Sequence, residues 1–115
     1  MDFNEYQRRA ISTDLEGKKA GDDIFYLGFM TKVLGLAGEA GEVTEDVKKI
    51  LRDKGGKITD ADREELTLEL GDVMWYIAVV ADYLGVTMEE IVEKNIEKLA
   101  SRQKRGTLSG SGDNR

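Results

Sequence analysis

The sequence predicts an all-α fold with four helices. Three observations support this prediction: the 115 residues contain no proline, apolar residues recur with helical spacing, and the alternation typical of strands is weak. The length suggests one domain. We therefore expect a helical domain over residues 1–106 and a tail rich in Gly and Ser over residues 107–115.

The first predicted helix covers Asn4–Ser12, and a polar loop follows it. The second runs from about Asp23 to Arg52 and ends at a turn with two consecutive glycines, which is a typical stop signal. Within it, the stretch GLAGEAGEV carries three glycines. Each glycine costs a helix interior about 1 kcal/mol relative to alanine, so these positions need a reason other than helix stability.

The third predicted helix covers about Asp62–Leu84, and either Thr59 or Asp60 is a suitable N-cap for it. From Val73 to Ala81 this helix is apolar all round, which indicates deep burial. Its expected core stripe consists of Leu66, Leu70, Val73, Ile77, Val80 and Leu84.

The fourth predicted helix begins at a capping-box pattern, in which Thr87 is followed three residues later by Glu90. It continues to about Lys104. The remaining stretch, RGTLSGSGDNR, has the composition of a flexible end. A second interpretation is a loop that closes over phosphates or reaches a neighbouring subunit through Arg105 and Arg115.

The composition restricts the chemistry. There is no cysteine and no histidine, so a bound metal must be held by oxygen ligands, which favours Mg²⁺, Mn²⁺ or Ca²⁺. The net charge of −6 argues against nucleic acid as a partner. The longest apolar run, VMWYIAVVA, is too short to span a membrane, and the N-terminus does not resemble a signal peptide. We expect a cytoplasmic protein.

Two pairs of acidic residues interrupt apolar helix faces. Glu39 lies inside the apolar stripe of the second helix with Glu42 at its edge, and Glu69 and Asp72 lie among apolar residues of the third. The members of each pair are three residues apart and share a face, so antiparallel packing would bring four carboxylates together. They cannot all stay ionised at close range without cations, and hard divalent metals are suitable counterions.

A solvated helix face is the alternative explanation for such pairs in a chain of this charge. The glycines beside the acids bear on the choice. Gly38, Gly41 and Gly71 remove side chains next to the carboxylates and would leave room for ions and water. The same glycines would also permit close packing of two helices, and this second explanation stays open.

A basic stripe marks the last helix. Asn95, Lys98, Arg102 and Arg105 fall within about 80° on the helical wheel. Cations near a helix C-terminus are favourable for the macrodipole, which would explain the arginines without a ligand. The functional interpretation is that the basic residues neutralise phosphates while the asparagine binds a sugar or phosphate oxygen.

The stretches GEAGEV, ELGDVMWYI and NIEKLASR, in this order, resemble the MazG-like nucleoside triphosphate pyrophosphohydrolases of the all-α NTP pyrophosphohydrolase superfamily. The family pattern is E-E-x-x-E followed by E-x-x-D. Gly38 stands where the family often has its first Glu, whereas Glu69 and Asp72 match the second motif. The resemblance covers about residues 30–106. It implies a four-helix bundle-like protomer in an obligate homo-oligomer, either a homodimer or a dimer of dimers.

The resemblance also implies an activity, which is Mg²⁺-dependent cleavage of NTPs or dNTPs between the α and β phosphates to NMP and pyrophosphate, with Mn²⁺ as a substitute metal. The implied metal ligands are Glu39, Glu42, Glu69 and Asp72. Glu42 would also take the proton of the attacking water. The implied substrate-binding residues are Asn95, Lys98 and Arg102, to which the basic stripe adds Arg105.

Other functions remain open at this point. Within the superfamily, the chain could be a dUTPase-like enzyme or a phosphoribosyl-ATP pyrophosphohydrolase. Outside it, a non-catalytic helical interaction module would pair its buried acids with Lys48, Lys98 or Arg102. Trp75 and Tyr76 could stack on a base, although a place in the core or in a dimer interface is the better interpretation.

Overall fold

The computed structural model describes residues 1–15 and 27–115, which contain four α-helices and no strand. The all-α prediction is therefore confirmed for these residues. The helices are α1 (Phe3–Ser12), α2 (Leu27–Lys54), α3 (Asp60–Tyr83) and α4 (Met88–Lys104). Their ends lie within a few residues of the predicted ones. The predicted start of the second helix, at Asp23, lies outside the described residues.

Local side-chain contacts explain where α3 and α4 begin. Thr59 caps α3 and forms a reciprocal capping box with Asp62, and Thr87 does the same for α4 with Glu90. Asp62 also accepts a hydrogen bond from Lys54 Nζ at 2.5 Å. The hydrogen bonds from Lys54 and Thr59 lower the pKa of Asp62 to about 2, and the one from Lys54 has the largest effect. This capping carboxylate therefore stays ionised at neutral pH.

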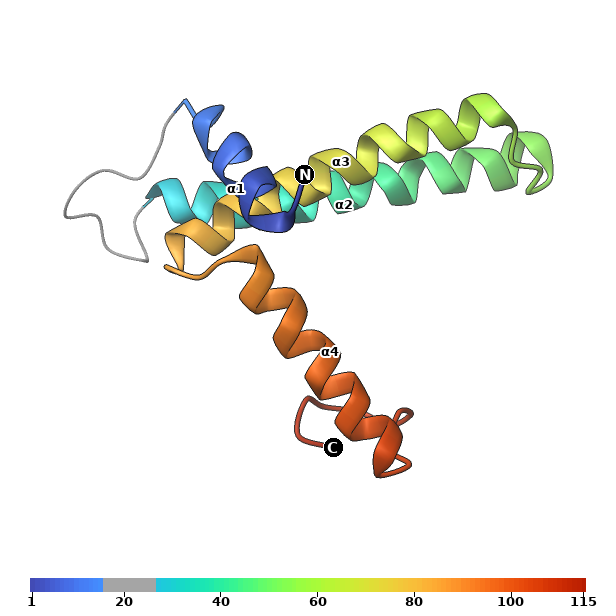
Figure 1. Cartoon of the computed structure of the whole chain (residues 1–115). Helices are drawn as coiled ribbons and strands as arrows, with labels where there is room; N and C mark the ends of the chain where they lie inside the picture. Colours follow the sequence, from blue (N-terminus) through green and yellow to red (C-terminus); the bar gives the residue numbers. More distant parts are fainter. Residues whose placement is uncertain (16–26) are drawn as a thin grey trace.

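The two long helices, α2 and α3, form an antiparallel hairpin, and α1 lies against α3 (Figure 1). The small core between α1, α3 and the start of α4 contains Ala10, Ala78 and Met88. Gln7 connects these elements, because its side chain donates to the carbonyl oxygens of Ala78 and Val86 and accepts from the Met88 amide. A buried side chain on α1 therefore holds the corner between α3 and α4.

The direction of α4 differs from the expected bundle-like arrangement. The chain bends by 101° between α3 and α4, and α4 extends away from the hairpin (Figure 1). Among the described helices α4 contacts α1 and α3 but not α2. A single chain therefore does not close a four-helix bundle, because α2 and α4 do not pack against each other.

This arrangement leaves large apolar side chains exposed on the hairpin and on α4. Leu34 and Leu68 are 70% and 64% exposed on the hairpin, and Ile96 is 64% exposed on α4. Two members of the predicted core stripe, Leu70 and Leu84, are about half exposed. The buried apolar residues of α3 instead lie in its C-terminal third, namely Ala78, Val79, Ala81 and Tyr83.

No single helix among the described residues is long and apolar enough to cross a membrane. By length and composition alone, α3 and α4 taken together as a bent pair would pass that test.

Candidate functional site

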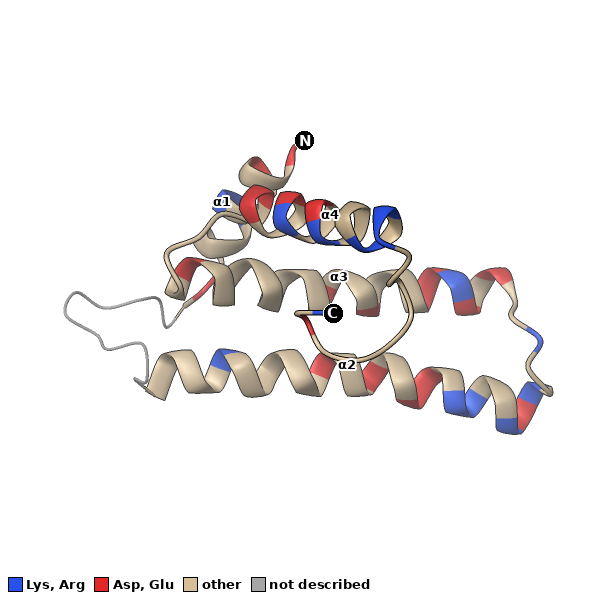
Figure 2. Ribbon diagram, turned by 90° about the horizontal axis from the view of Figure 1, so that it is seen from below, with Lys and Arg blue, Asp and Glu red and all other residues tan. Residues whose placement is uncertain are grey.

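The predicted acidic residues meet in the middle of the α2–α3 hairpin. Carboxylate oxygens of Glu39, Glu69 and Asp72 all lie within 4.8 Å of one another. Figure 2 shows acidic residues in red along the facing middle parts of α2 and α3. The antiparallel pairing is what brings the two E-x-x-[ED] pairs together, since each pair shares one helix face. This part of the predicted juxtaposition is confirmed.

Glu42 lies close to this group without belonging to it. The pKa of Glu69 is raised above its ordinary value, first by burial and then by the charges of Asp46, Asp72, Glu39 and Glu42. Four neighbouring carboxylates therefore make the ionised form of Glu69 less favourable. The influence of Asp46 was not part of the predicted site. Its position four residues after Glu42, on the same side of α2, is the signal that could have indicated it.

No basic side chain neutralises the predicted ligands within the part of the chain that the structure describes. Lys48 pairs with Glu45 at 2.8 Å, and both Lys98 and Arg102 pair with Asp113. The interaction-module alternative requires Lys48, Lys98 or Arg102 to pair with the buried acids. Those ion pairs are not formed.

The glycines near the acidic residues, on α2 and α3, have different surroundings. A Cβ at residue 35 would overlap the ring of Tyr76, so Gly35 permits the close approach of α2 and α3. By contrast, Gly38, Gly41 and Gly71 have no other group within 4 Å of where a Cβ would lie. Close packing inside the chain therefore explains only the first glycine. The others leave open space beside the carboxylates, as the site hypothesis expects.

The aromatic residues near the site have packing roles. Tyr76 fills the space at Gly35, and Trp75 packs edge-on against it with ring centroids 4.9 Å apart. The indole Nε1 donates to Thr13 Oγ1 at 2.8 Å. These contacts favour the core interpretation of both residues over base stacking.

Among the described residues, no hydrogen bond or ion pair joins the basic stripe of α4 to the clustered carboxylates of the same chain, because Lys98 and Arg102 pair with Asp113 and Arg105 donates to Arg115. Asn95 and Arg105 are exposed on α4, and Asn95 is not among buried apolar neighbours as its wheel position suggests. Arg102 is only 5% exposed. It is covered by residues 107–115, which fold back along α4 and contact it.

The donor set at the hairpin fits a hard divalent cation. Only carboxylate oxygens are present, and they carry excess negative charge. Oxygens bound to one Mg²⁺ lie about 3 to 4 Å apart, since the Mg–O distance is about 2.1 Å. Small side-chain rotations would therefore place oxygens of Glu39, Glu69 and Asp72 around one ion.

Comparison with known proteins agrees with this geometry. Residues 28–107 match the MazG nucleotide pyrophosphohydrolase domain family. The chain is 47% identical over 116 residues to the Gene 37 protein of Mycobacterium phage L5, with all of both chains covered. It is 36% identical over 72 residues to the uncharacterized protein YvdC of Bacillus subtilis strain 168, covering 58% of this chain and 68% of that protein.

No solved structure matches the chain significantly. The family match nevertheless spans most of the chain and contains both acidic pairs and all of α4. The carboxylate cluster thus lies within the matched domain. The chain belongs to the MazG nucleotide pyrophosphohydrolase family.

Proposed function

We propose that this protein hydrolyses NTPs or dNTPs at the bond between the α and β phosphates and releases NMP and pyrophosphate, in the manner of a house-cleaning enzyme of the nucleotide pool. The observation that supports this most directly is the group of three carboxylates, Glu39, Glu69 and Asp72, within 4.8 Å of one another and without a basic partner among the described residues. Such a group requires cations, and a metal–triphosphate complex supplies them.

The proposed cofactor is Mg²⁺, with Mn²⁺ as a substitute, held by Glu39, Glu42, Glu69 and Asp72. A bound divalent ion neutralises phosphate charge and lowers the pKa of a coordinated water. Glu42 takes a proton in this proposal, and its position near the cluster and its exposure to solvent support this role. Glu39, Glu69 and Asp72 orient the complex, and basic side chains stabilise the pyrophosphate that leaves.

The basic side chains come, in this proposal, from a second copy of the chain. Asn95, Lys98, Arg102 and Arg105 lie on α4, which does not reach α2 in its own chain. Exposed apolar residues on both the hairpin and α4 support a homodimer or a dimer of dimers, in which α4 of one copy lies across the hairpin of another. We also propose a cytoplasmic location. The acidic net charge of −6 agrees with a ligand that is a nucleotide rather than a nucleic acid.

The test measures pyrophosphate release from a panel of NTPs and dNTPs, including dUTP and phosphoribosyl-ATP, with Mg²⁺ present. Wild type should turn over at least one substrate, and Glu42→Gln should lower kcat by about 10²-fold or more, the usual contribution of a general base. Glu64→Gln, which removes an equal charge from an exposed position of α3, is the matched control and should retain full activity.

The same substrate panel also separates the proposed general activity from the dUTPase and phosphoribosyl-ATP pyrophosphohydrolase activities. Turnover confined to dUTP or to phosphoribosyl-ATP would replace the general assignment by one of these two specialised activities. No turnover of any nucleotide with Mg²⁺ or Mn²⁺ would overturn the proposal and favour the non-catalytic module.

A further inference from the structure

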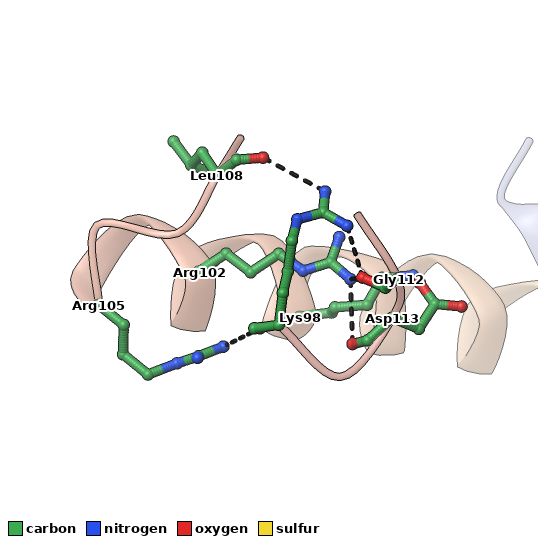
Figure 3. A network of polar contacts seen from close by, with 7 residues as sticks. Lys98, Arg102, Arg105, Leu108, Gly112 and Asp113 are labelled. Carbon is green, nitrogen blue, oxygen red and sulfur yellow. Dashed lines mark hydrogen bonds and ion pairs between the residues drawn. The ribbon is translucent and has the colours of Figure 1, made fainter. Parts of the chain in front are cut away.

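The segment after α4, residues 107–115, folds back along α4, and its polar contacts concentrate on basic side chains (Figure 3). The predicted flexible end therefore has a defined place in the structure. The family match ends at residue 107, so nearly all of this segment lies outside the matched domain. We call residues 107–115 the C-terminal tail.

One carboxylate oxygen of the tail is shared by two cations. Oδ1 of Asp113 lies 3.1 Å from Lys98 Nζ and 3.2 Å from Arg102 Nη2. The same Arg102 nitrogen also donates to the main-chain oxygens of Gly112 and Asp113, at 3.2 and 3.0 Å. A carboxylate oxygen between a lysine and an arginine occupies the kind of position that a phosphate oxygen takes in such sites.

The third basic residue is engaged by the end of the tail. Arg105 Nη2 donates to the main-chain oxygen of Arg115 at 2.8 Å. The Arg115 side chain in turn donates to the carbonyl oxygens of Gly112 and Leu108, at 2.5 and 3.3 Å. These contacts close the tail on itself and hold its backbone over α4.

The tail backbone needs glycine to make this turn. Gly110 and Gly112 have φ angles of +120° and +81°, which other residues rarely adopt. The tail turns over Arg102, which is only 5% exposed. The Nε atom of Arg102 is buried without a hydrogen-bond partner. The tail therefore covers an arginine that still has an unused donor.

The contact is nevertheless easy to replace. The Asp113 side chain is 81% exposed, so solvent reaches its carboxylate even though Arg102 beneath it is 5% exposed, and ion pairs that solvent screens contribute little to stability. Lys98 and Arg102 hold the pKa of Asp113 below its ordinary value, so the carboxylate is ionised at neutral pH. A polyphosphate, with more charge and more acceptor oxygens than one carboxylate, would compete well for the same donors.

We propose that the C-terminal tail is an intramolecular latch in which Asp113 occupies a phosphate-binding position at Lys98 and Arg102, so that the substrate must displace the tail. This inference rests on the proposed function, because that function assigns the α4 cations to the substrate. The latch weakens binding of every phosphate ligand at this position and leaves the chemical step unchanged.

The first experiment measures binding of inorganic pyrophosphate by calorimetry to wild type, Asp113→Asn and a chain that ends at Thr107. Both variants should bind about two- to fivefold more tightly, the range expected for losing a competing ion pair whose carboxylate is exposed to solvent. Glu64→Gln, with the same loss of charge on α3, should bind as wild type does, and Lys98→Ala should bind weakly with or without the tail.

The second measurement is steady-state kinetics on the substrate that the panel identifies. Asp113→Asn should lower KM by a similar factor and leave kcat unchanged. Equal or weaker binding by Asp113→Asn and by the shortened chain would overturn the latch, and so would a failure of all variants to bind pyrophosphate.

The two proposals fail in different ways. Normal turnover with no effect of Asp113→Asn on KM or on pyrophosphate binding refutes the latch and leaves the activity intact. Pyrophosphate binding that tightens in Asp113→Asn, in a protein that turns over no nucleotide, supports the latch as an anion switch and refutes the activity.

Discussion

The Glu69 carboxylate lies in an electrostatic environment that disfavours its ionised form. Burial comes first among the causes that raise its pKa, and four neighbouring carboxylates, Asp46, Asp72, Glu39 and Glu42, add to it. Ionised Glu69 is therefore less favourable in the folded protein than in the unfolded chain. A bound divalent cation would reverse this balance, because it interacts favourably with the ionised form.

We predict that Glu69→Gln makes the metal-free protein more stable at neutral pH. A raised pKa penalises the folded state once pH rises through the range between the ordinary value of 4.5 and the raised one. Below pH 4.5 the penalty is absent, so wild type and variant should then differ little. Thermal melts in EDTA from pH 4 to pH 8 measure this, with Glu64→Gln as the control.

The same variant separates the metal site from a solvated acidic face. In wild type, millimolar Mg²⁺ should raise the melting temperature at neutral pH, and in Glu69→Gln this increase should be lost or much reduced. Equal Mg²⁺-dependent shifts in both proteins would contradict the assignment of Glu69 as a metal ligand.

At the scale of the helix, α2 shows that identical residues in one stretch can have different causes. Gly35 is required by contact, since a Cβ there would overlap the Tyr76 ring. The ring has little freedom to move, because Trp75 packs against it. Gly38, only one turn later, faces open space within the chain.

We predict that Gly35→Ala lowers the free energy of unfolding by about 1–3 kcal/mol, the usual effect of overpacking. Gly38→Ala should raise it by about 0.5–1 kcal/mol, because alanine is the better helix former and meets no neighbour in the chain. Urea denaturation of the two variants beside wild type measures both changes.

Each outcome at these glycines has a structural meaning. A stabilising effect of Gly35→Ala would contradict the close approach of α2 and α3 at Tyr76. A destabilising effect of Gly38→Ala would indicate that a second copy of the chain packs on this part of α2.

At the scale of the whole molecule, the main question is how the basic stripe of α4 meets the carboxylates of the hairpin. Within one chain α4 turns away by 101° and has no contact with α2. Figure 2 shows blue segments on α4, interspersed with red ones, and red segments along the middle of the hairpin. The proposed site uses both groups, and in that proposal the basic residues come from a second chain.

We predict that two inactive variants restore activity when they are refolded together. Glu69→Gln removes a proposed metal ligand from the hairpin, and Lys98→Ala removes a proposed phosphate-binding residue from α4. Each variant refolded alone should be nearly inactive. In an equal mixture half of the dimers are mixed, and each has one intact site, so about a quarter of wild-type activity should return. Nucleotide turnover after joint refolding measures this.

The control for the mixing experiment is wild type refolded alone, which must recover its own activity. A mixture that stays as inactive as its parents, while refolded wild type is active, would contradict a site shared between two chains.

The sequence by itself determined the local features of this protein. Helix starts at Thr59 and Thr87 follow from capping boxes that involve only four residues each. The two acidic pairs follow from a spacing of three within a helix. Their meeting at the hairpin was also predictable, because a short turn with two glycines makes α2 and α3 antiparallel neighbours.

Only the tertiary structure decided the features that depend on distant contacts. The direction of α4 depends on Gln7, whose hydrogen-bond partners lie 71 to 81 residues away. Gly35 and Gly38 look alike in sequence and differ only in whether Tyr76 faces them. The tail has the composition of a flexible end, but it is held because Arg102 and Lys98 share Asp113. Local patterns specify helices and their faces, whereas the partner that each face meets depends on residues far along the chain.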